Sequence, residues 1–435
     1  MKYHRLSLVL LMVLTLVLSG CSLGVESFLQ PPKLGGQQQA VQTALETYLK
    51  DKGDTRYTLE YPVEGEHTAA FLLCDSFGYP TKDEPDQVIA FYSLNASPEE
   101  THIHLLRRDG EEWVSVADTV GAGVDIREVA FGDLNGDGTA EMITGWTTHY
   151  SRADQLMIYH LDDKLTPAAE GLPYTSLYVG DLTATGEDSL LVLTVADRVT
   201  ATLQKMEGGR LNTVASVALD GGIRQFGSRT LCRLDTGIHG LYVEGLKAGD
   251  TAVTELIYYD GEGLHAPFYN PETDTTAVTT RPAFLAAQDI DGDGRVEVPF
   301  ASPLVENATQ DVGDVFVEWK TWDYATDTWR HHSYTLPNAV DGYMVKLDGG
   351  IHTHLAVKYN EQTHTLTLTD TDTKQAWLWL TVGEELPEEP AEDLESLTLF
   401  SASQGEVFYY AWFDPAVVGA EKVQYMVTRL IREGG

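Results

Sequence analysis

Most of this chain alternates apolar and polar residues in short segments, which is the pattern of half-buried β-strands. Turn pairs such as Asp109-Gly110, Gly208-Gly209 and Asp260-Gly261 separate neighbouring segments. These pairs favour β-hairpins because their residues adopt tight-turn conformations readily. Five such hairpins are predicted, at residues 102–116, 155–169, 201–215, 255–268 and 315–332. The pattern therefore predicts a mainly β protein.

A recurring loop precedes each hairpin. It is clearest in DLNGDGTAE at residues 133–141 and in DIDGDGRVE at residues 289–297, and weaker copies begin at Asp75, Asp181 and Cys232. Loop, strand, hairpin and return strand predict a four-stranded antiparallel blade in each unit, and blades in series predict a β-propeller. Five blades are visible, with six or seven possible. Aligning the units on the ninth loop position superimposes Asp86, Glu141, Ser189, Gly240 and Glu297.

The segment that precedes the first blade has a helical period. In residues 37–53, the apolar residues Val41, Ala44, Leu45, Tyr48 and Leu49 fall on one face. We expect this helix to pack against the first blade, and a helix that binds a partner is the alternative. The helix and the propeller together form the predicted domain 36–337.

After Pro337 the repeat disappears. Segments such as HLAVKY, THTLTLTD and QAWLWLTV predict further strands, and ELPEEPAEDLE at residues 385–395 predicts a mobile acidic loop. A closing amphipathic helix is predicted from the spacing of Val423, Met426, Val427, Leu430 and Ile431. Residues 338–435 are therefore expected to form a separate small α+β domain.

The N-terminus indicates the compartment. Lys2 and Arg5 precede the apolar run LSLVLLMVLTLVL, which is too short to span a bilayer and ends in Leu-Ser-Gly-Cys at residues 18–21. This ending resembles the bacterial lipobox, which implies that residues 1–20 are a signal peptide and that Cys21 carries a lipid. Residues 21–35 would then be the lipidated cysteine and a tether, and the protein would be extracytoplasmic and membrane-anchored. An ordinary secretory signal is the alternative.

The net charge argues against one class of partner. The chain has 66 acidic and 29 basic residues, a formal charge of −37. Such a chain repels polyanions, so we expect no nucleic-acid partner. Cys74 and Cys232, the cysteines after Cys21, are expected to be unpaired apolar residues, and a disulfide between them is the alternative.

The two complete loops carry candidate metal ligands. In the first, Asp133, Asn135, Asp137 and Glu141 hold positions 1, 3, 5 and 9, and Thr139 completes the predicted set at position 7. The corresponding residues of the second loop are Asp289, Asp291, Asp293, Glu297 and Arg295. Oxygen ligands at alternate positions suit Ca²⁺, and Gly138 and Gly294 allow the turn. These are not EF-hands, because position 12 is Thr144 or Phe300 rather than a bidentate glutamate.

Both loops resemble the calcium loops of FG-GAP or VCBS repeats, and FGDLNGDGTAEMITGW at residues 131–146 is similar to the family pattern. The resemblance covers roughly residues 60–335. It implies a propeller with structural Ca²⁺ in the two intact loops, whereas the eroded loops at Asp181 and Cys232 are expected to lack metal. The family serves adhesion, assembly and enzyme scaffolding, so the resemblance does not decide the function.

Other chemistry has weaker support. The pairs His331-His332 and His352/His354 offer few ligands for a transition metal, and exposed histidines are the alternative. Six tryptophans, whose paired spacing is typical of cross-strand contacts, form a candidate carbohydrate platform: Trp319, Trp322, Trp329, Trp377, Trp379 and Trp412. The sequence contains no GxSxG, HExxH, CxxC or P-loop motif.

These observations predict a monomeric, lipid-anchored binding or scaffold protein that recognises an envelope protein or a glycan and is not an enzyme. The first alternative is a cell-envelope polysaccharide hydrolase that uses the propeller as a substrate platform. The second is a structural envelope component whose C-terminal domain docks another protein.

Overall fold

The computed structural model describes residues 36–54, 56–149, 153–283, 285–302, 316–347, 354–401 and 407–429. These residues form a mainly β structure with six antiparallel sheets of four or five strands and two α-helices. The predicted signal peptide, Cys21 and tether lie outside the described residues.

The first sheet is covered by the predicted N-terminal helix. The helix α2 spans Gly36–Lys52, and it buries Val41, Leu45 and Leu49 against Val88 and Leu106 of the sheet. This contact confirms the predicted packing. The strands of this sheet are β1 (Tyr57–Leu59), β2 (Phe71–Cys74), β3 (Gln87–Leu94), β4 (Ser97–Asp109) and β5 (Glu112–Val120).

The second and third sheets each consist of four consecutive strands. The second contains β6 (Asp125–Gly132), β7 (Glu141–Thr147), β8 (Asp154–His160) and β9 (Pro167–Tyr174). The third contains β10 (Ser176–Gly180), β11 (Ser189–Val195), β12 (Val199–Glu207) and β13 (Arg210–Ala218). The apolar runs of β7 and β11 are largely buried, as expected for inner strands covered on both faces.

The fourth and fifth sheets add a fifth strand from a later segment. The fourth contains β14 (Ile223–Asp235), β15 (Ile238–Lys247), β16 (Thr251–Tyr259), β17 (Leu264–His265) and β18 (Arg281–Pro282), with the 3₁₀ helix η2 at Ala277–Thr279. The fifth contains β19 (Glu297–Ser302), β20 (Phe316–Asp323), β21 (Thr328–Asn338), β22 (Tyr343–Leu347) and β28 (Val427–Arg429). All five predicted hairpins are therefore present as antiparallel pairs.

The sixth sheet lies in the C-terminal region. It contains β23 (Leu355–Asn360), β24 (Thr365–Asp370), β25 (Ala376–Gly383), β26 (Glu395–Ser401) and β27 (Phe408–Phe413), with β27 between β25 and β26. The strand β26 begins where the acidic segment 385–395 ends and is not among the strands predicted from the sequence.

The structure differs from the prediction of a separate domain at residues 338–435. The boundary falls at the end of β21, and β22 and β28 from the C-terminal region belong to the same sheet as β19 to β21. The closing helix is also shorter than predicted. The helix α3 spans only Ala420–Met426, because Val427 begins the strand that pairs with β22.

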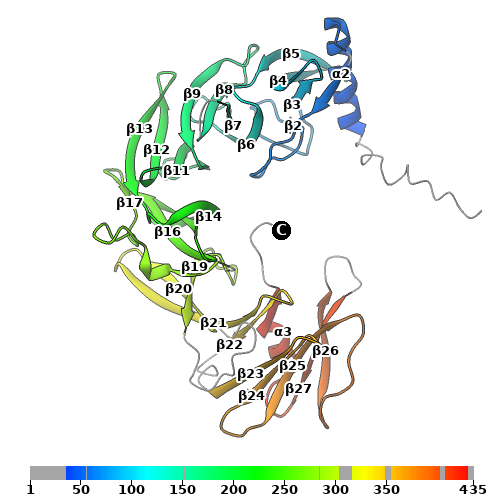
Figure 1. Cartoon of the computed structure of the whole chain (residues 1–435), viewed down its shortest axis with the longest axis vertical. Helices are drawn as coiled ribbons and strands as arrows, with labels where there is room; N and C mark the ends of the chain where they lie inside the picture. Colours follow the sequence, from blue (N-terminus) through cyan, green and yellow to red (C-terminus); the bar gives the residue numbers. More distant parts are fainter. Residues whose placement is uncertain are drawn as a thin grey trace, which may run out of the picture.

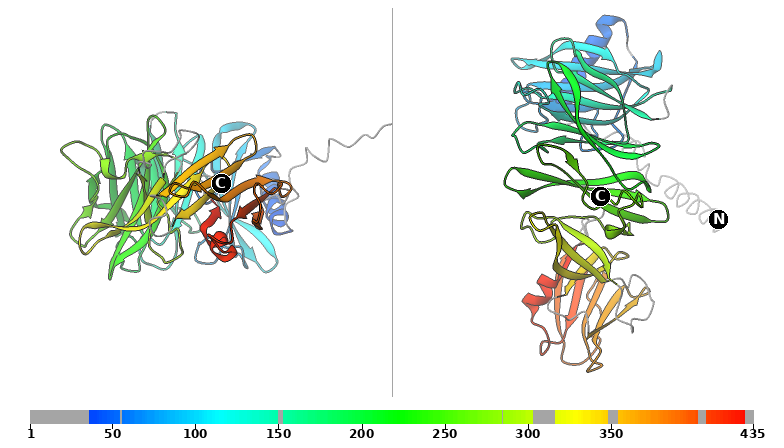
Figure 2. Two further views of the ribbon diagram at one scale, coloured as in Figure 1. Left: turned by 90° about the horizontal axis from the view of Figure 1, so that it is seen from below. Right: turned by 90° about the vertical axis from the view of Figure 1, so that its left-hand side faces the viewer.

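Hydrophobic clusters join each sheet to the next. Residues of the first and second sheets share one cluster, and the second and third, third and fourth, fourth and fifth, and fifth and sixth sheets share others. The sheets follow an arc in Figure 1, and Figure 2 shows the same succession along the long axis. The first and sixth sheets lie at the two ends of the arc, and no hydrophobic cluster of the described residues joins them.

Candidate metal sites in two loops

Each of the two predicted metal loops leads directly into a strand. The ninth residue of each loop begins that strand: Glu141 begins the inner strand β7, and Glu297 begins the edge strand β19. Ser189 of the weaker loop at Asp181 begins β11 in the same way. The repeat therefore places each of these three loops directly before a strand, in the second, third and fifth sheets.

In the first loop, Asp133 organises the turn. Its Oδ1 accepts hydrogen bonds from the backbone N–H groups of Gly136 (2.7 Å) and Asp137 (3.1 Å), and its Oδ2 accepts one from Gly138 (2.7 Å). Gly136 and Gly138 have φ values of +74° and +86°, which side chains with a Cβ rarely adopt. The glycines therefore allow the N–H groups to converge on one carboxylate.

The other predicted ligands of the first loop also form hydrogen bonds within this turn. Asn135 Oδ1 accepts a hydrogen bond from Asp137 N–H (2.8 Å), and Asp137 Oδ1 accepts one from Thr139 N–H (2.8 Å). The side chain of Glu141 is buried, which raises its pKa. Its carboxylate accepts hydrogen bonds from Leu134 N–H (2.9 Å) and Asn135 Nδ2, and it lies 3.1 Å from His160 Nδ1.

The second loop repeats this geometry. Asp289 accepts hydrogen bonds from the N–H groups of Asp291, Gly292, Asp293 and Gly294 at 2.6 to 3.3 Å. The N–H of Asp293 also donates to Asp291 Oδ1 (3.2 Å). One carboxylate oxygen from each of Asp289, Asp291 and Asp293 lies within 4.8 Å of the other two. Arg295, at position 7, donates its N–H to Asp293 Oδ1 (2.8 Å).

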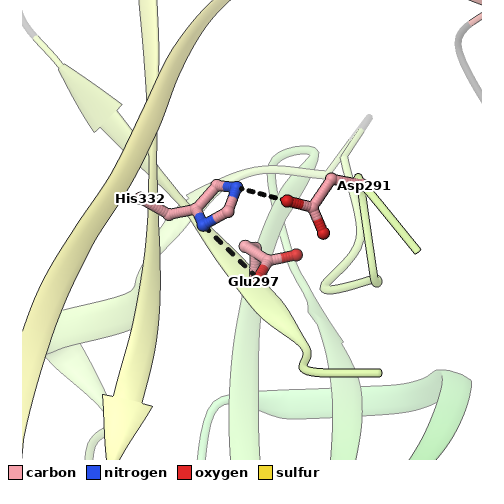
Figure 3. A group of neighbouring side chains, drawn as sticks. All are labelled: Asp291, Glu297 and His332. Atoms are coloured by element: carbon pink, nitrogen blue, oxygen red, sulfur yellow. Dashed lines mark ion pairs between the residues drawn. The ribbon is translucent and has the colours of Figure 1, made fainter. Parts of the chain in front are cut away.

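In the second loop, Glu297 lies beside His332 (Figure 3). Glu297 accepts a hydrogen bond from Ile290 N–H at Oε2 (3.0 Å), and its side chain is fully buried. His332 of β21 places Nε2 3.3 Å from Asp291 Oδ2 and Nδ1 3.8 Å from Glu297 Oε1. Burial raises the pKa of Glu297 to about 7, and the neighbouring carboxylates of Asp291, Asp293 and Asp289 add to the rise.

The loop at Asp181 has the same turn without the acidic ligands. Asp181 accepts hydrogen bonds from the N–H groups of Thr185 (3.0 Å) and Gly186 (2.8 Å), but positions 3 and 5 are Thr183 and Thr185. At Cys232 the strands β14 and β15 meet in a tight turn between Asp235 and Ile238. The aspartate turn itself therefore forms without a set of acidic ligands.

His160, the neighbour of Glu141, is the site residue that the sequence did not indicate, whereas His332 was expected only as part of the His331-His332 pair and not beside Glu297. His160 is the cross-strand partner of Glu141 in the register of β7 and β8, so the predicted hairpin could have revealed it. His332 lies two strands away from Glu297, and a contact of this kind leaves no local pattern. Asp188, at the end of the neighbouring loop, accepts a hydrogen bond from Asp133 N–H (3.1 Å).

The tryptophan, histidine and cysteine residues considered in the sequence are packed against neighbouring residues or exposed. Trp319 and Trp377 are buried, Trp322 and Trp329 pack with Phe268, and Trp379 pairs across strands with Trp412. His352 lies outside the described residues, whereas His354 is exposed beside Asp372. Cys74 and Cys232 are unpaired, as predicted, and burial raises the pKa of both thiols to about 12.

A groove of about 630 Å³ opens beside the second loop, between the β14–β15 turn and the β20–β21 hairpin. Its lining includes Arg233, Arg295, Arg330, Trp322, Tyr324 and Asp293. Arg330 is paired with Asp323. The groove thus combines aromatic rings, cationic groups and one wall of the metal loop.

No helix among the described residues combines the length and the apolar character needed to span a bilayer.

No protein-family model and no curated protein matches the sequence. Among solved structures, the chain is similar to Sqt1 of Saccharomyces cerevisiae, with a TM-score of 0.32, 8% identity and coverage of 75% of this chain and 92% of that one. It is also similar to the rhamnogalacturonan lyase PL11 of Bacillus licheniformis, with a TM-score of 0.31, 12% identity and coverage of 74% and 71%. Similarities at these TM-scores carry no argument about function.

Proposed function

We propose that this chain is a lipid-anchored extracytoplasmic binding or scaffold protein of the FG-GAP/VCBS type, related in architecture to β-propellers. Its two complete loops would hold structural Ca²⁺, and its surface would recognise an envelope protein or a glycan. The protein would act by binding rather than by catalysis.

The calcium proposal rests on one observation: two loops repeat the same arrangement of side-chain oxygens. Both loops converge backbone N–H groups on a first-position aspartate and present further side-chain oxygens at positions 3, 5 and 9. A carboxylate oxygen that accepts an N–H bond retains a lone pair for a cation. Such oxygen-rich sets suit a hard ion, and extracellular calcium modules bind it with a Kd of about 10⁻⁴ to 10⁻³ M.

The groove beside the second loop supports a recognition role. Aromatic faces and a few placed polar groups are common features of ligand sites. The groove presents the half-buried Tyr324 and the exposed Arg233 and Arg295 on a protein of net charge −37. The lining also includes Asp235, Asp293 and Asp323, so the groove offers both hydrogen-bond donors and acceptors to a polar ligand such as a glycan. Calcium in the second loop would stabilise the wall formed by residues 293–296.

Calcium dependence tests the scaffold. We expect chelator to lower the melting temperature, because a site at tenfold saturation stabilises the fold by about 1.4 kcal/mol. Asp291→Ala should lower the melting temperature in calcium and hardly change it in chelator. Thr183→Ala, at the same position of the loop without acidic ligands, is the matched control and should show no calcium-dependent change. Equal melting of the unsubstituted chain in calcium and chelator would exclude the metal proposal.

Recognition is tested with the purified chain and cell-wall glycans, together with crosslinking in intact cells. Saturable binding that Arg233→Ala weakens would support the groove, and Arg210→Ala, an exposed arginine of the β12–β13 turn, is the control. Turnover of a glycan would instead support the hydrolase alternative. Equal binding by both variants would place recognition elsewhere on the surface.

A further inference from the structure

The second loop contains an imidazole that the oxygen-only ligand pattern does not include. His332 reaches the loop from β21, two strands away from β19 in the same sheet. One ligand atom from each of Asp291, Glu297 and His332 lies within 4.8 Å of the other two. Figure 3 shows the His332 ring beside the two carboxylates, with one ring nitrogen directed at each.

Glu297 provides an independent indication of a ligand. Its side chain is 0% exposed, and its Oε1 has no hydrogen-bond partner among the described residues. A buried carboxylate oxygen without a partner is costly, because it has lost water and gained no donor. The corresponding oxygen of Glu141 in the first loop receives the Asn135 amide and lies 3.1 Å from His160 Nδ1. Among the described residues, the carboxylate oxygen of the second loop thus lacks the hydrogen-bond donor that the first loop supplies.

We propose that Asp291, Glu297 and His332 form a binding site for a first-row divalent cation of the Zn²⁺ class. Imidazole nitrogen and carboxylate oxygen together suit such an ion, whereas Ca²⁺ prefers six to eight oxygens. Small side-chain adjustments would bring the three ligand atoms to the separations found around zinc. Asp291 and His332 are 32% and 26% exposed, so the ion can enter from solvent while Glu297 stays buried.

This site goes beyond the proposed calcium function and uses two of the same residues. Asp291 and Glu297 belong to both ligand sets, so zinc and calcium would compete in the second loop. The first loop has the neutral Asn135 at the position of Asp291, and its glutamate oxygen already receives hydrogen bonds. Zinc should therefore displace calcium from the second loop and leave the first loop unaffected.

The test is calorimetric titration of the full mature chain with zinc chloride, in chelator-treated buffer and again in excess calcium. We expect one zinc ion per chain in addition to any bound by exposed histidines. His332→Gln should weaken this site by at least about tenfold, since changes in the shell around a ligand already cost that much. His331→Gln is the matched control, because the neighbouring imidazole lies beside Glu318 instead, and it should retain the zinc affinity.

Equal zinc affinity in the unsubstituted chain and in folded His332→Gln would overturn the proposal. If His332→Gln does not fold, X-ray absorption of the zinc-loaded unsubstituted chain decides, because a spectrum without an imidazole ligand would also overturn it. Zinc binding without any calcium effect on melting would refute the calcium scaffold and leave this site intact. Calcium stabilisation without a His332-dependent zinc site would refute the zinc site and leave the calcium scaffold intact.

Discussion

At the scale of single residues, the carboxylates of this acidic chain occupy two environments. Many are exposed, and a few are buried within the sheets together with their partners. Glu244 pairs with Arg281 and accepts hydrogen bonds from Thr254 Oγ1 (2.7 Å) and Ala287 N–H (2.8 Å). The carboxylate of Glu255 accepts hydrogen bonds from the described residues at only one of its two oxygens. Its Oε1 accepts bonds from Asp220 N–H (2.9 Å) and Thr276 Oγ1 (2.6 Å), and its buried Oε2 has no hydrogen-bond partner among the described residues.

This arrangement gives Glu255 a predictable effect on stability. Burial raises the pKa of Glu255 from 4.5 to about 7, and the nearby carboxylate of Asp220 contributes to the rise. The folded chain therefore keeps a proton that the unfolded chain releases. The stabilisation is complete below the unfolded pKa and is lost as the pH rises through about 7.

We expect Glu255→Gln to reduce this loss, because a neutral amide retains an oxygen for the two donors and stays uncharged. Relative to the unsubstituted chain, the variant should gain stability between about pH 5 and pH 8. Free energies of unfolding from urea titrations at the two pH values measure the effect. Glu187→Gln, at an exposed glutamate, should show no such gain. An unchanged difference between the pH values in Glu255→Gln would contradict the assignment.

At the scale of elements, the periodicity of apolar residues predicts helices and strands correctly where residues close together in the chain determine the structure. The helical face of Val41, Leu45 and Leu49 is buried as predicted, and the predicted hairpins are present. The C-terminal helix was predicted too long. Its apolar spacing continues past Met426, but Val427 and Thr428 are β-branched and pair with Val345 and Met344. Tertiary pairing therefore ends the helix earlier than its periodicity indicates.

The candidate metal loops also combine residues placed by local sequence with a residue placed by tertiary structure. Asp289, Asp291 and Asp293 are brought together by a local turn, so their convergence could be predicted from spacing. His332 comes from another strand, and its approach depends on the pairing of β19, β20 and β21. Only the register of those strands places the imidazole beside Glu297.

At the scale of the whole molecule, the core is divided into clusters that each join neighbouring sheets. This organisation resembles that of repeat proteins, in which stability is distributed among local interfaces. The ends of the arc share no hydrophobic cluster among the described residues. Local destabilisation of one end should therefore spread only to adjacent sheets.

Leu368→Ala tests this expectation in the sixth sheet. Leu368 of β24 is fully buried in the cluster shared with the fifth sheet, and its truncation should cost about 2 to 5 kcal/mol. Hydrogen exchange measured by mass spectrometry should increase in the fifth and sixth sheets and remain unchanged in the first. Thr367→Ala, at the preceding residue of the strand and on its opposite face, is the control. A uniform increase along the chain would show that the molecule unfolds as one cooperative unit.

The sequence by itself determined the mainly β class, the N-terminal helix, the predicted hairpins and the aspartate turns, because each depends on residues close together in the chain. Only the tertiary structure decided that there are six sheets in an arc, that β28 joins β22 in the fifth sheet, and that His332 faces Glu297. These features depend on contacts between segments far apart in the chain. Several pairings are compatible with the same local patterns, so packing and strand register select among them.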